Sequence, residues 1–133
     1  MSLPEEHLYS RLTNFSGITA LISSRIYSVK LPANCTFPAV SYSRISSNPV
    51  ESMTGSTALS FARFQLDSWA KTYLESKNLA EQVRLALQGY KGTIAGITFF
   101  GVNFIGDRDL FDDDAEIYRV SADYWIHYNE TQP

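Results

Sequence analysis

Two segments with strict period-two alternation limit what this chain can fold into. Over residues 61–70 and again over residues 118–128, apolar side chains occupy nearly every second position. Successive side chains of a strand point to opposite faces, so this period predicts two strands that each bury one face. The other faces are polar but also carry Trp69 and Trp125. The fold must therefore bury one side of a sheet and accommodate large aromatic side chains on the other.

The segment between these strands reads as the main helix. Thr72 and Glu75 have the spacing of a capping box at its start. Its apolar side chains recur at helical spacing and form one core-facing stripe: Leu79, Val83, Ala86, Leu87 and Tyr90. Gly89 and Gly92 are candidates for the C-terminal end of this helix.

An N-terminal helix is predicted to begin at Ser2, which we expect to cap it, with Pro4 in its first turn. Leu8 and Leu12 lie on its apolar face. A second short helix is expected over residues 17–23, capped by Ser16 and burying three side chains: Ile18, Leu21 and Ile22.

Three more strands are predicted at residues 25–29, 37–45 and 93–105, the last with Gly96 and Gly101 as bends. The order of elements favours an α+β fold, an antiparallel sheet of about four to five strands covered by one main helix and an N-terminal helix. A chain of 133 residues suits one compact domain, residues 1–133.

Two segments lack periodicity. Residues 46–59 are rich in Ser, Thr, Asn and Gly and read as a long flexible loop or hairpin, with Met53 near its middle. This loop is either a functional arm or a solvated connection. Residues 106–116 are predicted to form an acidic turn, and residues 129–133 a polar tail.

Composition and spacing favour no catalytic or metal site. His7 and His127 are far apart in the sequence, Cys35 is the only cysteine, and no metal-binding or nucleophile motif is present. The acidic segment fails the calcium-loop pattern, since Asp112 stands where glycine is needed. We therefore expect no cofactor and no enzymatic activity; the alternative is a small pocket that uses Cys35, His127 or the acidic turn.

Charge and hydropathy limit the partners. The net charge is −3 and the basic residues are dispersed, which argues against direct readout of nucleic acid. The N-terminus lacks a signal-peptide pattern and no apolar run is long enough to span a bilayer, so no membrane contact is expected.

Seven residues are candidates for an interface with other proteins. Asp67, Trp69 and Trp125 lie on the polar faces of the two alternating strands, which would adjoin if those strands pair. Ordinary cross-strand pairing, or cover by a helix, would equally explain these three. The acidic turn contributes Asp109, Asp112 and Asp113 as a surface for a basic partner, and the long loop contributes Met53.

Several short segments, in order along the chain, resemble the tail-completion proteins of long-tailed siphophages, also called tail-terminator or tail-to-head joining proteins. They are Arg25-Ile26-Tyr27, Phe37-Pro38-Ala39-Val40-Ser41-Tyr42, Gln65-Leu66-Asp67-Ser68-Trp69-Ala70 with Ala80, Val83, Ala86 and Leu87 after it, and Tyr118-Arg119-Val120-Ser121-Ala122-Asp123-Tyr124. With the helix that precedes them, the matches span residues 3–128. The segments 46–59 and 106–116 depart from the pattern.

This resemblance implies an α+β fold and a homo-oligomeric, hexameric ring that caps the tail tube. The ring would end tube polymerisation and present a surface to the head connector. The implied partners are further copies of the chain, the major tail-tube protein and a head-completion protein. The implied location is the virion tail or neck, after assembly in the host cytoplasm. The alternative functions are another phage assembly module, such as a head-completion or baseplate component, and a small enzyme.

Overall fold

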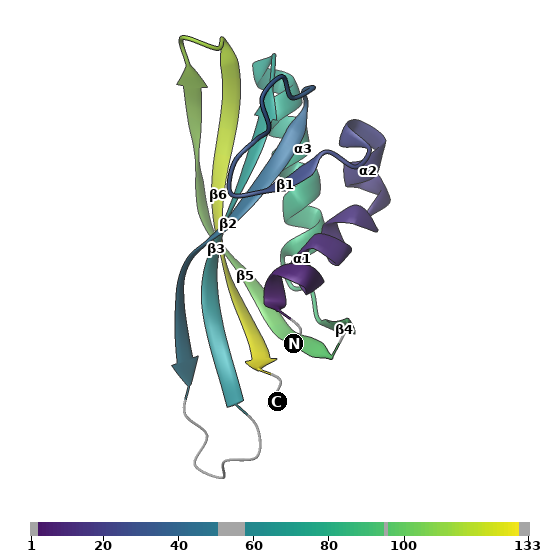
Figure 1. Ribbon diagram of the computed structural model, residues 1–133, viewed down its shortest axis with the longest axis vertical. Coiled ribbons are helices and arrows are strands. Elements are labelled where there is room, and N and C mark those ends of the chain that lie inside the picture. The colour runs from purple at the N-terminus through teal and green to yellow at the C-terminus, as the bar shows by residue number, and fades with distance from the viewer. Residues whose placement is uncertain (1–2, 51–57, 95, 131–133) are drawn as a thin grey trace.

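The computed structural model describes residues 3–50, 58–94 and 96–130. Within them, six strands form one sheet and three helices pack on one of its faces (Figure 1). The helices are α1 (Pro4–Thr13), α2 (Ser16–Ile22) and α3 (Tyr73–Leu87). The strands are β1 (Ile26–Ser28), β2 (Ala39–Val50), β3 (Ala58–Ala70), β4 (Gly92–Ile94), β5 (Ile97–Asp112) and β6 (Ile117–Glu130).

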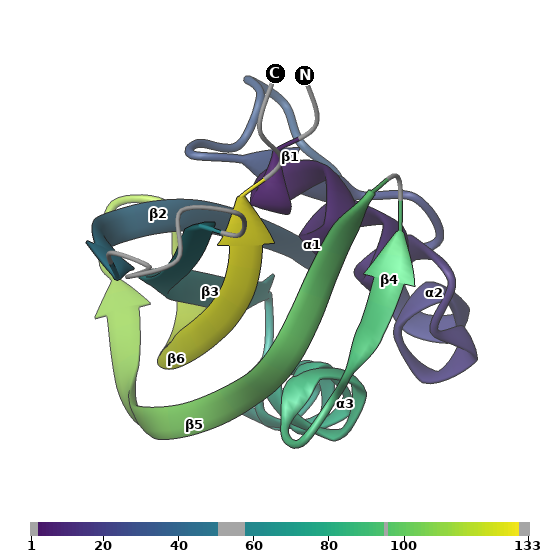
Figure 2. The ribbon, with the colours of Figure 1, turned by 90° about the horizontal axis from the view of Figure 1, so that it is seen from below.

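The sheet has the order β1-β2-β3-β6-β5-β4 and curves into a half-barrel (Figure 2). Its neighbours are antiparallel except for β1 and β2, which are parallel. The α+β class is as expected, but the antiparallel sheet of four to five strands is wrong. Residues 29–38 return the chain so that β2 runs in the same direction as β1. The strand expected over residues 93–105 divides at Gly96, whose φ of 85° lets the chain reverse between β4 and β5.

The core lies between the sheet and the helices. The alternating side chains of β3 and β6 supply fully buried Phe64 and Tyr124, and α3 contributes Leu79 and Leu87. The core faces predicted from period-two alternation are confirmed, because alternate residues of β3 and β6 are buried: Ala62, Phe64, Leu66 and Ala70, and Ala122, Tyr124 and Ile126.

One predicted helix cap is confirmed and two are wrong. Thr72 is the N-cap of α3, and its Oγ1 accepts a hydrogen bond from the Glu75 N–H at 3.2 Å. Helix α1 instead begins after Leu3, whose side chain makes no cap bond, and Ser2 lies outside the described residues. Helix α2 has Phe15 as its N-cap and no side-chain cap bond, so Ser16 lies in its first turn rather than capping it. Ile18 and Ile22 are the buried residues of α2, whereas Leu21 is 41% exposed rather than buried.

Two long hairpins extend the sheet beyond the predicted strand ends. Pairing of β2 with β3 continues to Val50 and Leu59, and pairing of β5 with β6 continues to Asp112 and Ile117. Strand therefore includes residues 46–50, 58–59 and 106–112 of the non-periodic segments, because backbone N–H and C=O groups pair whatever side chains they carry. The two hairpins point to opposite ends of the long axis (Figure 1). Residues 51–57 and 131–133 lie outside the described residues.

Among the described residues, the outer edges of β2 and β5 are covered only in part, so each of these long strands has an open edge. β1 pairs with β2 only at residues 40–42, and β4 pairs with β5 only at residues 97–99. The register shifts leave Ile45, Phe100 and Ile105 as extra residues, and these side chains are 51%, 48% and 41% exposed. Bulges of this kind at a sheet edge hinder uncontrolled strand addition.

Candidate interaction surface

The sheet face opposite the helices, here called the open face, carries much of the candidate interface. Cross-strand register places on it the alternate residues of β2, β3 and β6, among them Ser41, Arg63, Gln65, Asp67, Trp69, Arg119, Ser121, Asp123 and Trp125. Helices α1, α2 and α3 all lie on the other side (Figure 1). The open face is therefore built from three neighbouring strands.

Trp69 is held in place by neighbours on both sides. Its Nε1 donates a hydrogen bond to the Ser41 hydroxyl oxygen at 3.0 Å, and the guanidinium of Arg119 lies 4.8 Å from its ring centroid. Asp67, only 7% exposed, accepts a bond from Gln65 Nε2 at 3.0 Å and lies 3.7 Å from Arg119 Nη1. The carboxylate of Asp67 is thus compensated within the sheet.

Trp125 lies further along the same face. Its ring meets Phe61 edge-on, with centroids 5.2 Å apart, and its cross-strand partner is Arg63. Arg63 Nη2 donates to Asp123 Oδ2 at 2.5 Å. Because β3 and β6 are neighbours, the tryptophans and carboxylates of these strands do share one face; their role as an interface stays a prediction.

The acidic residues have three different surroundings. Asp109 accepts hydrogen bonds from the Tyr73 hydroxyl at 2.7 Å and from Lys77 Nζ at 3.0 Å, and these bonds lower the pKa of its carboxyl. Asp112 Oδ1 accepts from the backbone N–H groups of Asp114 and Ala115 and so shapes the turn. Asp113 is exposed within that turn. Asp109 and Asp112 therefore have structural contacts of their own.

The structure brings some of the predicted residues together. Trp69 and Asp112 line one pocket of about 300 Å³ with Leu110, Phe111 and Arg119. Asp67 lies beside this pocket through its contact with Arg119. Trp125 lies apart from it along β6, and Met53 lies outside the described residues.

Sequence reasoning missed a second pocket, of about 230 Å³, between α3 and strands β5 and β6. Its wall includes Tyr124, which alternation correctly placed in the core, and Asp107, which was assigned to a turn. Burial raises the pKa of the Tyr124 hydroxyl. No local pattern in the sequence links two strands and a helix, so no signal could have indicated this pocket.

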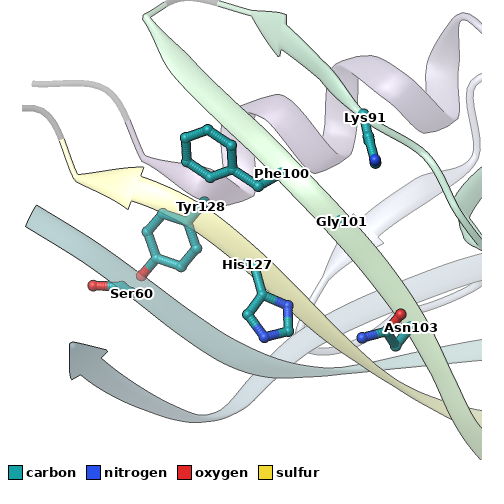
Figure 3. Close-up of a pocket in the computed structure, with 7 residues that line it drawn as sticks. All are labelled: Ser60, Lys91, Phe100, Gly101, Asn103, His127 and Tyr128. Carbon is teal, nitrogen blue, oxygen red and sulfur yellow. The ribbon is translucent and has the colours of Figure 1, made fainter.

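A third pocket, of about 620 Å³, has mainly carbon at its surface and includes Ser60 and His127 (Figure 3). Ser60 pairs with Tyr128, the residue after His127, so Ser60 and His127 stand on opposite faces of the sheet. They are therefore not arranged as a nucleophile and its base.

Among the described residues, no three His, Cys, Asp or Glu side chains gather as a metal site would require. None of α1, α2 and α3 is long and apolar enough to cross a membrane. The surfaces that remain are aromatic groups, paired charges, two hairpins and two open edges, which suit contacts with other proteins.

These features describe an α+β protein whose surfaces suit contacts with other proteins. The chain belongs to the family described as "Tail completion protein gp17", whose model matches residues 6–129. Proteins of this family are structural components of phage tails, so the family expected from the short sequence segments is confirmed.

Two further comparisons complete this result. The fold is similar to that of a chain in the structure titled "Virion of native gene transfer agent (GTA) particle". The TM-score is 0.73 and the identity 16%, and the match covers 92% of each chain. The sequence matches none of the curated proteins with which it was compared.

Proposed function

We propose that this protein caps the finished tail tube as a homo-hexameric ring, ends its polymerisation and forms the joining surface for the head connector. Its partners are further copies of itself, the major tail-tube protein and a head-completion protein. It works in the virion neck after assembly in the host cytoplasm, with no catalytic step, no membrane contact and no direct readout of nucleic acid.

The observation that carries this proposal is the position of the two hairpins. A protein that joins two structures needs two separate surfaces, and the β2–β3 and β5–β6 hairpins point to opposite ends of the long axis (Figure 1). Their chemistry also differs. Residues 107–116 hold a dense set of carboxylates, whereas residues 46–59 contain a single charged residue, Glu51. Each end therefore suits a different partner.

The ring itself requires contacts that close. In a ring, each copy presents one surface to the copy before it and a different surface to the copy after it. The two open sheet edges, on β2 and β5, lie at opposite sides of the sheet and meet this requirement. The residues proposed for contacts within the ring or with its neighbours are Asp67, Trp69, Trp125, Asp109, Asp112, Asp113 and Met53.

Disruption of the gene in its phage or prophage tests the function directly. After induction, negative-stain electron microscopy of the lysate should show filled heads separate from tails, with tails overlong or ragged. A plasmid copy of the gene should restore joined particles. Normal joined particles without the gene would reject tail completion.

Shortening the β2–β3 hairpin tests one of the two ends. Deletion of residues 48–57 leaves Ser47 and Ala62, which are cross-strand partners, joined by residues 58–61. A connection of four residues suits a hairpin. We expect a folded subunit that no longer joins tails, and a fully active deletion variant would show that this end is not needed.

A further inference from the structure

The pocket between α3 and strands β5 and β6, here called the α3–β5 pocket, contains a polar group whose hydrogen bonding is incomplete. It is lined by Lys77, Ala80, Glu81, Arg84, Phe104, Asp107, Ala122 and Tyr124. The side chain of Tyr124 is fully buried, yet its hydroxyl has no hydrogen-bond partner among the described residues. A buried tyrosine hydroxyl ordinarily has a partner. The hydroxyl oxygen is itself sealed from solvent, so a group that enters the pocket reaches it only when the side chains around it move.

Two cationic and two anionic side chains line the pocket, and three of the four have an ion pair. Lys77 is paired with Asp109 at 3.0 Å, and Arg84 is paired with Glu81. Asp107 forms no ion pair among the described residues. Asp107 is therefore the lining charge to which a cation from outside, able to donate hydrogen bonds, would bind.

The pocket is also next to an open strand edge. Phe104 and Asp107 flank the bulge at Ile105, whose side chain is 41% exposed. β4 pairs with β5 only at residues 97–99, so no strand among the described residues covers β5 at this bulge. A neighbouring molecule can therefore approach the pocket from this side.

We propose that the α3–β5 pocket receives the side chain of Lys30 from a neighbouring copy of this chain. The proposal rests on the ring proposed above and specifies its contact between copies. The ammonium group of Lys30 would donate hydrogen bonds to the Asp107 carboxylate and the Tyr124 hydroxyl, two of the three donors that a lysine offers.

Lys30 is chosen by its place in the fold. A ring brings opposite sides of the subunit together, and Lys30 follows β1, at the sheet edge opposite the pocket. Lys30 is exposed and forms no ion pair among the described residues. The other exposed basic side chains of this kind lie elsewhere: Arg108 on β5 itself, Lys91 beside β4, and Lys71 between β3 and α3.

The segment that carries Lys30 is itself unusual. Val29, just before it, has a φ of 66° and a side chain that is 75% exposed. A β-branched residue in this conformation is a genuine outlier, and such backbone strain gathers at functional positions. The exposed apolar side chains of Val29 and Ile105 would lie near each other in the same contact.

Exchange of the two charges tests the pairing. Lys30→Asp and Asp107→Lys should each reduce the yield of joined particles by at least about tenfold, because each leaves like charges facing each other in an interface. The double variant should restore most of the yield. Lys71→Ala is the control and should leave the yield unchanged. Lys30, Asp107 and Lys71 are all exposed, so thermal unfolding should show folded subunits throughout.

Tyr124→Phe tests the contribution of the Tyr124 hydroxyl to the contact between copies. It removes only the hydroxyl that has no partner, so the thermal stability of the free subunit should stay the same or rise slightly. The yield of joined particles should fall by a few-fold. An unchanged yield would mean that the hydroxyl is satisfied by water alone, which would overturn its part in the contact.

Cross-linking gives a readout that does not depend on tail joining. In a Cys35→Ser background, Lys30→Cys and Asp107→Cys together should allow a short thiol cross-linker to form ladders of covalently joined subunits in purified particles. Either cysteine alone should form no ladder. Complete particles without ladders would overturn the Lys30 contact while leaving tail completion intact. The charge exchange can also overturn the Lys30 contact. If Asp107→Lys loses function and Lys30→Asp does not restore it, the cation comes from another virion protein.

Discussion

The Nε2 atom of His7 lies 2.9 Å from the hydroxyl oxygen of Tyr90, which joins the first turns of α1 to the segment after α3. The Nδ1 atom of the same ring lies 2.8 Å from the Ile97 carbonyl oxygen. A carbonyl only accepts, so Nδ1 carries the proton and Tyr90 donates to Nε2. The ring also stacks on Phe99, with centroids 3.8 Å apart. A neutral histidine thus holds α1 against β5.

This arrangement predicts a stability that declines in mild acid. Burial, together with the nearby charge of Arg11, lowers the pKa of His7 below its ordinary value, although the Ile97 hydrogen bond opposes the shift. The unfolded chain therefore takes up the proton first. The contribution of His7 to stability is complete above a pH of about 6.5 and is lost as the pH falls through the lower pKa of the folded state.

Urea unfolding of wild type and His7→Gln between about pH 7.5 and pH 5 measures this effect. We expect His7→Gln to cost about 2 kcal/mol at neutral pH, with the difference shrinking in acid. His127→Gln, at an exposed position, is the control. A difference that is constant with pH would contradict a buried neutral His7.

The bond between Trp69 and Ser41 should stabilise the open face. Trp69→Phe keeps most of the ring but leaves the nearly buried Ser41 hydroxyl without its donor, so the free energy of unfolding should fall by about 1 kcal/mol. A double-mutant cycle with Ser41→Ala isolates the bond, and the second substitution should cost less once the first is present. Strictly additive effects would show that the bond contributes nothing.

The N-cap of α3 should contribute measurably to the free energy of unfolding. Thr72→Ala removes the acceptor for the Glu75 N–H and should lower the free energy of unfolding by about 1 kcal/mol. Thr72→Ser keeps the acceptor and should be nearly neutral. Thr36→Ala, in the loop before β2, serves as the surface control. Equal losses for the alanine and serine variants at position 72 would rule out the cap.

Asp109 should hold the β5–β6 hairpin against α3. Asp109→Asn weakens its contacts with Tyr73 and Lys77, so backbone amides near the end of β5 should exchange hydrogen faster while the core strands keep their protection. The same loss should appear in wild type in acid, because the pKa of Asp109 is lowered and its stabilising charge disappears as pH falls through that value. Asp113→Asn is the matched control, and the same exchange in both variants would contradict this role.

Much of the local structure could be predicted from the sequence because local patterns encode it. Alternation identified β3 and β6 and their buried faces, and the Thr72 capping box identified the start of α3. The ordered short segments identified the family. The pairing of backbone groups between strands leaves no comparable pattern in the sequence. The predicted turn at residues 106–116 was therefore too wide, since polar side chains do not prevent strands from pairing along their neighbours. For the same reason β2 and β3 extend into the predicted loop or hairpin at residues 46–59, to Val50 and from Ala58.

By itself the sequence determined the α+β class, the core faces of the central strands and the absence of familiar catalytic motifs, since each depends on spacing within one segment. Only the tertiary structure decided that β1 lies parallel to β2, that β4 and β5 are separate strands, and that the hairpins point in opposite directions. It alone placed Asp107 and Tyr124 in one pocket and joined His7 to Tyr90. Each of these arrangements brings together segments that are distant in the sequence. They form because strands and most buried polar groups need hydrogen-bond partners, which the fold supplies from other segments.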